Sequence, residues 1–209
     1  MTISRTIASP YGEPLPWERG AGGSPWSPAR LTSLIVYDDA TRTAAYNTGV
    51  TSENLTALTV MGWVNPSSVV GFKGVLVGRG DAGAEHWRTD QNGAELRMIE
   101  NGANFGTKPA AVSAGAWSFF ASRYEGAGTG NAGRLRLWMG STEGTFTGYI
   151  GTIPAALTSR AGKTWRIGSF SDGSSGYSAF GSIAQVAICL AALTPAEIAA
   201  FYNYTLTRR

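Results

Sequence analysis

From Leu31 onward the chain consists of short apolar or alternating runs separated by turn residues. Runs of this length with turn signals between them are typical of an all-β sandwich or barrel. We therefore predict an all-β fold of two antiparallel sheets. The expected strands are Leu34–Tyr37, Leu58–Asn65, Gly74–Gly78, His86–Asp90, Ala94–Glu100, Ala116–Tyr124, Arg134–Met139, Thr164–Ile167 and Ser182–Cys189.

One short helix is predicted near the C-terminus. A Thr-Pro-Ala-Glu segment begins at Thr194, which places a capping box at the helix start and proline at its first position. Ile198, Phe201 and Tyr202 follow at helical spacing. We expect this helix to pack its apolar side on the sandwich.

Two predicted strands carry unusual outward faces. In Arg134–Met139, alternation directs the leucines and the methionine into the core and places Arg134, Arg136 and Trp138 on the other face. An outward tryptophan between arginines favours a binding role.

The Ser182–Cys189 run is apolar on nearly both faces, with Ala184, Val186 and Ile188 predicted to share one of them. A second apolar face needs a cover, which the C-terminal helix, the N-terminal segment or another subunit could provide. Ala184, Val186 and Ile188 are therefore candidate subunit contacts.

Residues 1–30 are rich in proline and glycine and show neither helical nor alternating periodicity. We predict an extended arm over 1–30 and a sandwich domain over 31–209. Trp17 and Trp26 are the candidate anchors, because each can bury a large apolar area. The pattern leaves open whether the arm folds back on its own domain or contacts a neighbouring subunit.

Composition narrows the function classes. The 209 residues fit one domain, and only 15% are charged, against about 25% in average proteins. The net charge is +3 with scattered basic residues, so a nucleic-acid partner is not expected.

We predict no membrane insertion and no secretion signal, because the apolar runs are short. Cys189 and His86 are the only residues of their types, which excludes an intrachain disulfide and disfavours a catalytic thiol.

Six segments in order, followed by the helical tail, resemble the laminin G-like members of the concanavalin A-like lectin/glucanase superfamily. The segments are Leu58–Pro66, Val75–Asp81, Trp117–Tyr124, Leu135–Trp138, Trp165–Gly168 and Phe180–Val186, with the tail at Leu193–Tyr202. The resemblance spans roughly residues 55–202. It implies a jelly roll of two antiparallel sheets that binds glycans or proteins, sometimes with a calcium ion on its rim.

Two departures from the family pattern bear on function. The hydrolytic branches use a Glu-x-Asp-x-x-Glu strand, which does not occur here, and Glu95 and Glu100 are spaced to face opposite sides of a strand. We therefore predict no enzymatic activity. Family members commonly carry acidic and aromatic residues near the last strand, where this chain has Ala184 and Gln185.

The candidate sites follow from polar and aromatic residues near the expected rim. For a glycan, the candidates are Trp87, Arg88, Asp90, Arg136, Trp138 and Tyr177. For calcium, the only cofactor considered, they are Asp81, Asp90 and Asn92. Packing beneath loops is the alternative for the aromatic residues, and turn formation is the alternative for the acidic ones.

Combining a lectin-like sandwich with no recognised export signal and no disulfide, we hypothesise a bacteriophage virion surface protein, either a capsid decoration or a tail component. Its partners would be other virion proteins, further copies of itself and host-surface glycans. A free-standing carbohydrate-binding protein is the main alternative, and a glycoside hydrolase is the weaker one.

Overall fold

A computed structural model describes residues 27–52, 55–81, 84–100, 104–157, 161–169 and 181–208. Of the predicted arm it includes a short 3-10 helix, Pro28–Arg30. The anchor candidates Trp17 and Trp26, and the ligand candidate Tyr177, lie outside the described residues.

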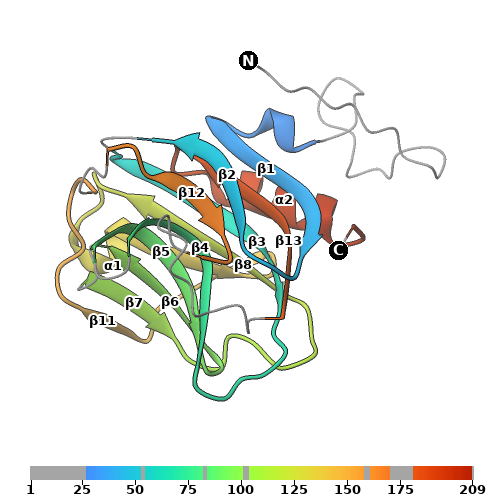
Figure 1. The fold of residues 1–209 in the computed structure, drawn as a ribbon. Coiled ribbons are helices and arrows are strands. Elements are labelled where there is room, and N and C mark those ends of the chain that lie inside the picture. The colour runs from blue at the N-terminus through green and yellow to red at the C-terminus, as the bar shows by residue number, and fades with distance from the viewer. Residues whose placement is uncertain are drawn as a thin grey trace.

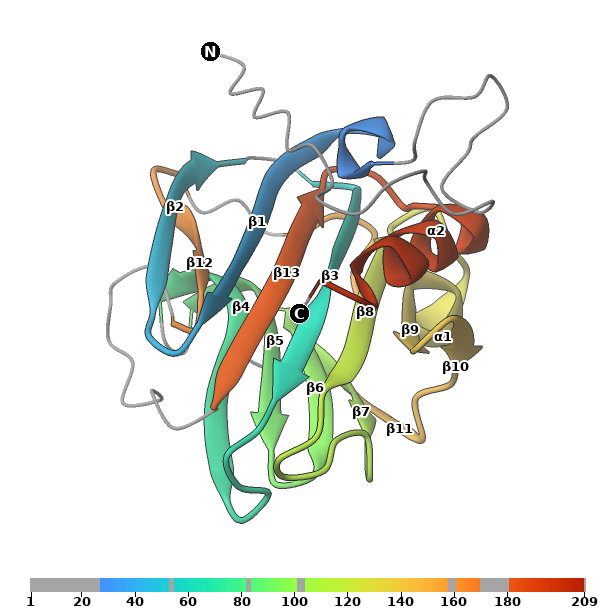
Figure 2. The same cartoon turned by 90° about the vertical axis from the view of Figure 1, so that its right-hand side faces the viewer.

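Two antiparallel sheets pack face to face (Figures 1 and 2). The six-stranded sheet runs in the order β1 (Leu34–Arg42), β13 (Ser182–Cys189), β3 (Ala57–Asn65), β8 (Ser118–Glu125), β9 (Leu135–Met139) and β10 (Thr142–Gly144). The seven-stranded sheet runs β11 (Gly148–Ile150), β7 (Asn104–Lys108), β6 (Glu95–Glu100), β5 (Ala84–Asn92), β4 (Phe72–Asp81), β12 (Thr164–Ile167) and β2 (Tyr46–Thr51). The prediction of an all-β, two-sheet jelly-roll sandwich is confirmed.

The main core lies between the two sheets. Alternate residues of central strands meet there, including Leu58 and Val60 of β3 and Leu96 and Met98 of β6, all fully buried. Each such side chain contributes about 1.5–3 kcal/mol relative to leaving it in water. This core fixes which residues of every strand face outward.

A second apolar cluster lies on the outer face of the six-stranded sheet, beneath helix α2 (Pro195–Thr205). Ile198 and Phe201 are fully buried against it, and Tyr202 stacks on Trp63 at 5.4 Å. The Nε1 of Trp63 donates to Thr205 Oγ1 at 2.8 Å, which ties the end of the helix to the sheet (Figure 2). The predicted helix and its apolar side are confirmed.

Trp138 is buried, with 1% of its surface exposed, so the prediction of an exposed tryptophan is wrong. The alternation itself was interpreted correctly, because Leu135 and Leu137 enter the main core and Trp138 lies on the opposite face. That face is covered by α2 at Trp138. A sugar therefore cannot reach this ring.

The prediction that Ala184, Val186 and Ile188 share one face of the sheet is also wrong, because β13 contains a bulge. Gln185 adopts a left-handed backbone conformation (φ 52°), and the pairing with β3 shifts between Ala184 and Ala187. An inserted residue moves all later side chains to the opposite face. Val186 and Ile188 consequently lie in the main core, whereas Ala184 lies under α2. All three are buried within the chain, so they do not offer a subunit contact.

Four strands and one short helix were not predicted. β2, β7, β10 and β11 are short and carry many Gly, Thr and Asn residues, which weaken the alternation signal. α1 (Gly130–Arg134) begins in a glycine-rich stretch and leads directly into β9. β10 is an edge strand of the six-stranded sheet and β11 is an edge strand of the seven-stranded sheet. These two edges are neighbours, and α1 lies beside them (Figure 2).

The capping box that begins α2 predicts a measurable stability effect. Thr194 Oγ1 accepts from the Glu197 backbone N–H, and the Glu197 carboxylate accepts from the Thr194 backbone N–H at 2.7 Å. We expect Thr194→Ala to lower the free energy of unfolding by about 1 kcal/mol, because it removes the cap. Urea denaturation measures this change. Thr207→Ala, at an exposed position after the helix, is the matched control, and an equal loss in both variants would contradict the prediction.

Candidate functional site

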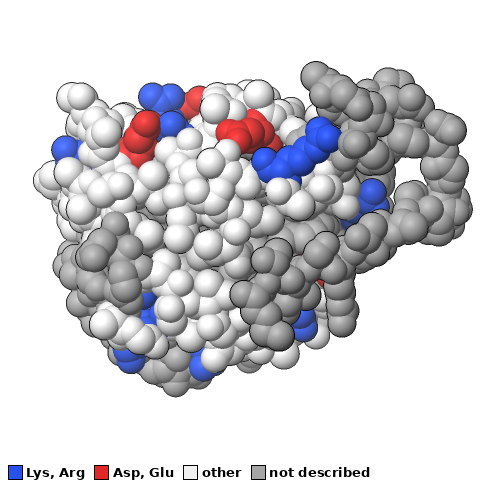
Figure 3. Space-filling view, turned by 90° about the horizontal axis from the view of Figure 1, so that it is seen from above, with Lys and Arg blue, Asp and Glu red and all other residues white. Residues whose placement is uncertain are grey.

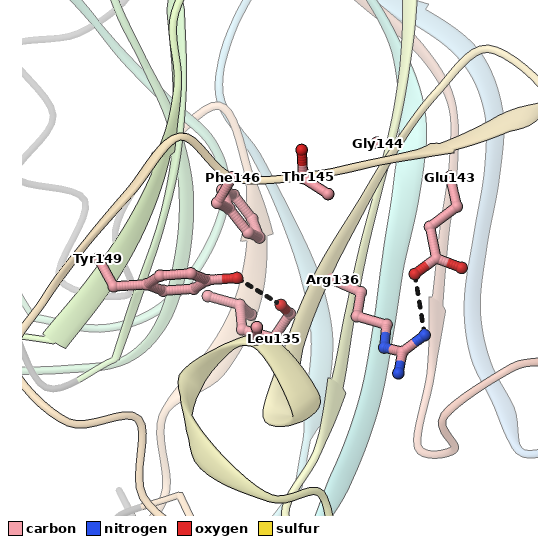
Figure 4. Close-up of a pocket in the computed structure, with 8 residues that line it drawn as sticks. Leu135, Arg136, Glu143, Gly144, Thr145, Phe146 and Tyr149 are labelled. Carbon is pink, nitrogen blue, oxygen red and sulfur yellow. Dashed lines mark hydrogen bonds and ion pairs between the residues drawn. The ribbon is translucent and has the colours of Figure 1, made fainter.

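A cavity of about 210 Å³ opens at the edge of the sandwich where β10 and β11 end the two sheets. Its lining comes from α1, β9, β10, β11 and the segment between the last two strands. The lining residues are Ala132, Leu135, Arg136, Glu143, Gly144, Thr145, Phe146 and Tyr149 (Figure 4). Residues from both sheets and from the link between them therefore meet in one hollow.

Two aromatic rings form one side of the cavity. Phe146 and Tyr149 lie edge to face, with ring centroids 5.6 Å apart. Phe146 fits against β7 because position 106 is glycine, since a Cβ there would lie 2.8 Å from the Phe146 ring. The absence of a side chain at Gly106 thus allows the ring to sit at this position.

The Tyr149 side chain connects the two sheets. Its hydroxyl donates to the Leu135 carbonyl of β9 at 3.3 Å (Figure 4). Burial raises the pKa of Tyr149 above its ordinary value, and the positive charge of Arg136 only partly opposes this. Tyr149 is therefore a neutral phenol near neutral pH, and its hydroxyl proton is held in the hydrogen bond to Leu135.

The opposite side of the cavity carries an ion pair. Arg136 donates through its terminal nitrogen to Glu143 Oε1 at 2.9 Å, between β9 and β10 (Figure 4). The two side chains are 42% and 37% exposed, so both reach solvent. Such a pair provides hydrogen-bond donors and acceptors side by side at the cavity mouth.

The α1 wall is held in place by one amide side chain. Asn131 Oδ1 accepts from the Ile153 backbone N–H at 2.9 Å, and Asn131 Nδ2 donates to the Gly151 carbonyl at 3.0 Å. Both ends of the amide are satisfied by the segment that follows β11. This arrangement fixes Ala132 against the rest of the lining.

Among the predicted glycan residues that the structure describes, Arg136 alone lines this cavity. Trp87 is 1% exposed and belongs to the main core, so its predicted contact with a ligand is wrong. The Trp87 ring points inward from β5 and packs beside Tyr124 of β8, with ring centroids 6.2 Å apart. Packing, the alternative considered from the sequence, is what the structure shows.

Arg88 and Asp90 are brought together, but as a buried network on the outer face of the seven-stranded sheet. Asp90 Oδ2 lies 2.8 Å from Arg88 Nε, and Asp90 accepts two hydrogen bonds from Arg97 at 2.8 and 3.0 Å. Burial raises the pKa of Asp90, although both guanidinium groups lower it. This carboxylate is occupied by arginines and is poorly placed to bind calcium.

The remaining calcium candidates are not assembled into a described site. Asn92 is half-buried at the end of β5, and the side chain of Asp81 lies outside the described portion. Among the described residues, no group of three or more His, Cys, Asp or Glu side chains is arranged to hold a metal ion. Calcium binding stays an untested prediction.

Sequence reasoning missed Glu143, Thr145, Phe146 and Tyr149. The available signal was two aromatic residues within a polar, glycine-containing segment, Ser-Thr-Glu-Gly-Thr-Phe-Thr-Gly-Tyr. That pattern resembles an ordinary loop, and only the folded arrangement of both sheet edges gathers these side chains.

Figure 3 views the molecule from above. The acidic groups in this view lie near basic groups along one side, and a broad area of the described surface beside them is uncharged. In the part of the chain that the structure describes, no helix is long and apolar enough to span a bilayer.

A family model described as the concanavalin A-like lectin/glucanases superfamily matches residues 38–199. The search of curated proteins gave no match. Among solved structures, the chain is similar to the NanB sialidase from Streptococcus pneumoniae (TM-score 0.53, 12% identity, covering 78% of this chain and 26% of that one). It is also similar to the Trypanosoma rangeli sialidase (TM-score 0.52, 9% identity, covering 89% of this chain and 34% of that one). A heptameric pentraxin from Limulus polyphemus is similar as well (TM-score 0.49, 13% identity, covering 78% of this chain and 81% of that one). The chain thus spans about a third or less of each sialidase.

The lone cysteine, Cys189, tests whether α2 shields the second apolar cluster from solvent. Cys189 is fully buried beneath α2, and burial, with a contribution from Glu197, raises the pKa of its thiol to about 12. We expect the native protein to resist iodoacetamide at about pH 8, because the reactive thiolate is absent and the sulfur is covered. The same protein in denaturant should label with one equivalent, as mass spectrometry would measure. Rapid labelling of the native protein would show that α2 does not cover this face.

Proposed function

Because the chain belongs to the concanavalin A-like lectin/glucanase superfamily, we propose that it is a non-catalytic glycan-binding protein whose contact site is the edge cavity. The observation that carries the proposal is the exposed Arg136–Glu143 pair opposite the Phe146 and Tyr149 rings. Sugars present hydroxyl groups around their edge and apolar C–H groups on their faces. Fixed donors and acceptors beside aromatic surface match both features.

The cavity chemistry favours binding over hydrolysis. Most glycosidases need two carboxyl groups on opposite sides of the scissile bond, and Glu143 is the only carboxylate among the cavity residues. Sialidases use a tyrosine nucleophile instead. Tyr149 is unsuited to that role, because its hydroxyl donates to a carbonyl and its pKa is raised. These observations support a lectin-like activity.

We further propose that the protein acts on the surface of a bacteriophage particle, held there by residues 1–26 with neighbouring copies or other virion proteins as partners. The apolar strand Ser182–Cys189 adds no support to this proposal, because α2 covers its outer face within the chain. The remaining support is the Pro/Gly-rich N-terminal segment with its two tryptophans, joined to a lectin-like fold.

The glycan-binding proposal predicts a specific loss in Arg136→Gln. We expect at least about tenfold weaker binding on a glycan array, since a charge-assisted hydrogen bond contributes roughly 1.5–3 kcal/mol. Arg123→Gln is a stringent control, because Arg123 lies directly opposite Arg136 on β8, forms its own pair with Glu125 at 2.7 Å and does not line the cavity. Equal binding by wild type and Arg136→Gln would refute the site, and no binding by wild type would refute the function.

The virion proposal predicts that deleting residues 1–26 abolishes incorporation into particles. The truncation keeps Pro28 and Leu31, which are buried in the described domain, so thermal unfolding should be unchanged. Quantitative mass spectrometry of purified particles, with full-length protein as the reference, measures incorporation. Undiminished incorporation would remove this segment from the mechanism.

A further inference from the structure

The edge cavity has features that limit which sugars it takes, beyond glycan binding in general. Its volume of about 210 Å³ is below the range of roughly 300–1,000 Å³ that is usual for small-molecule pockets. Ala132 of α1, Gly144 at the end of β10 and the following Thr145 border the space, and Asn131 fixes the α1 side. A space of this size suits one ring rather than a chain of rings.

The charges lining the cavity sum to zero. Among the described lining residues, only Arg136 and Glu143 carry a formal charge, and they lie 2.9 Å apart. Tyr149 adds no charge, because its phenol is neutral near neutral pH. An anionic ligand would gain from Arg136 but would face the Glu143 carboxylate at nearly the same distance. The lining therefore gives no net attraction to acidic sugars.

The ion pair presents an acceptor and a donor as neighbours. A Glu143 oxygen can accept from one sugar hydroxyl while the Arg136 guanidinium donates to the next, as both side chains are solvent-exposed. Two adjacent hydroxyl groups on a ring offer that donor and acceptor spacing. The partly buried Tyr149 ring on the other side, backed by the buried Phe146 ring, provides apolar surface for the C–H face of the same ring (Figure 4).

We infer that the cavity takes a single uncharged sugar ring at the end of a glycan, recognised through two adjacent hydroxyl groups. This inference rests on the proposed glycan-binding function and specifies its ligand class. The occupant is a neutral hexose unit with the remaining glycan directed out of the mouth.

Matched sugar pairs test the charge preference. Methyl glucoside and methyl glucuronoside share a ring and differ only at C6, as do methyl galactoside and methyl galacturonoside. Titration by ligand-observed NMR should show that wild type binds the uronate of neither pair more tightly than its neutral member. Glu143→Gln should weaken neutral binding and shift the affinity ratio toward the uronates, because Arg136 then remains unopposed. Glu125→Gln, which removes a carboxylate of similar exposure outside the cavity, should leave the ratio unchanged.

The terminal position is tested with a disaccharide ending in the preferred ring. Methylating two adjacent hydroxyls of that terminal ring should abolish binding, whereas retained affinity would show that an internal ring is recognised. A wild-type preference for uronates would overturn the inference while leaving glycan binding intact. Array binding by larger glycans without binding of any monosaccharide in the panel would also overturn it. Failure to bind both the panel and the array would overturn the proposed function itself.

Discussion

The packing of α2 on the six-stranded sheet is the interaction on which the rest of the structure depends. This sheet is apolar on both faces over much of its area, because Met61, Trp63 and Phe119 face outward as Leu58 and Val60 face the core. An uncovered apolar face of this kind would promote aggregation or force association. The helix covers it through Phe201 and Tyr202 and is fixed at its end by the Trp63–Thr205 hydrogen bond. The chain thereby covers the outer apolar face of this sheet with its own helix.

The position of the helix also determines where a polar site can form. On β9, Trp138 and Arg136 point to the same side of the sheet, yet Trp138 is fully covered and Arg136 is 42% exposed. The helix covers one portion of this strand and leaves the other open. Charged residues gather on the open portion, where Arg123 pairs with Glu125 and Arg136 pairs with Glu143. The cavity lies where this polar region meets the separating edges of the two sheets.

Much of the fold was predictable because it depends on local patterns. The alternation in β9 and the capping box at Thr194 predicted the right elements and the right apolar sides. The errors arose where long-range packing decides the outcome. Exposure of Trp138 depends on a helix some sixty residues later, and the faces of β13 depend on the bulge at Gln185, whose side chain bonds Tyr37, Asp39 and Arg208. The cavity was missed for the same reason, since Tyr149 lies on a strand too short to show a period and Phe146 lies in the segment before that strand.

The two arginine–carboxylate arrangements differ in how easily a ligand can use them. At Asp90, two guanidinium groups surround a fully buried carboxylate, and breaking such a pair is expected to cost roughly 3–5 kcal/mol. At Glu143, both partners are exposed, and such surface pairs contribute only about 0–1 kcal/mol to stability. A sugar hydroxyl can therefore compete for the Arg136–Glu143 pair at little energetic penalty, whereas the Asp90 network resists rearrangement. This difference in desolvation assigns a structural role to the Asp90 network and is consistent with the recognition role that we propose for the pair at the edge.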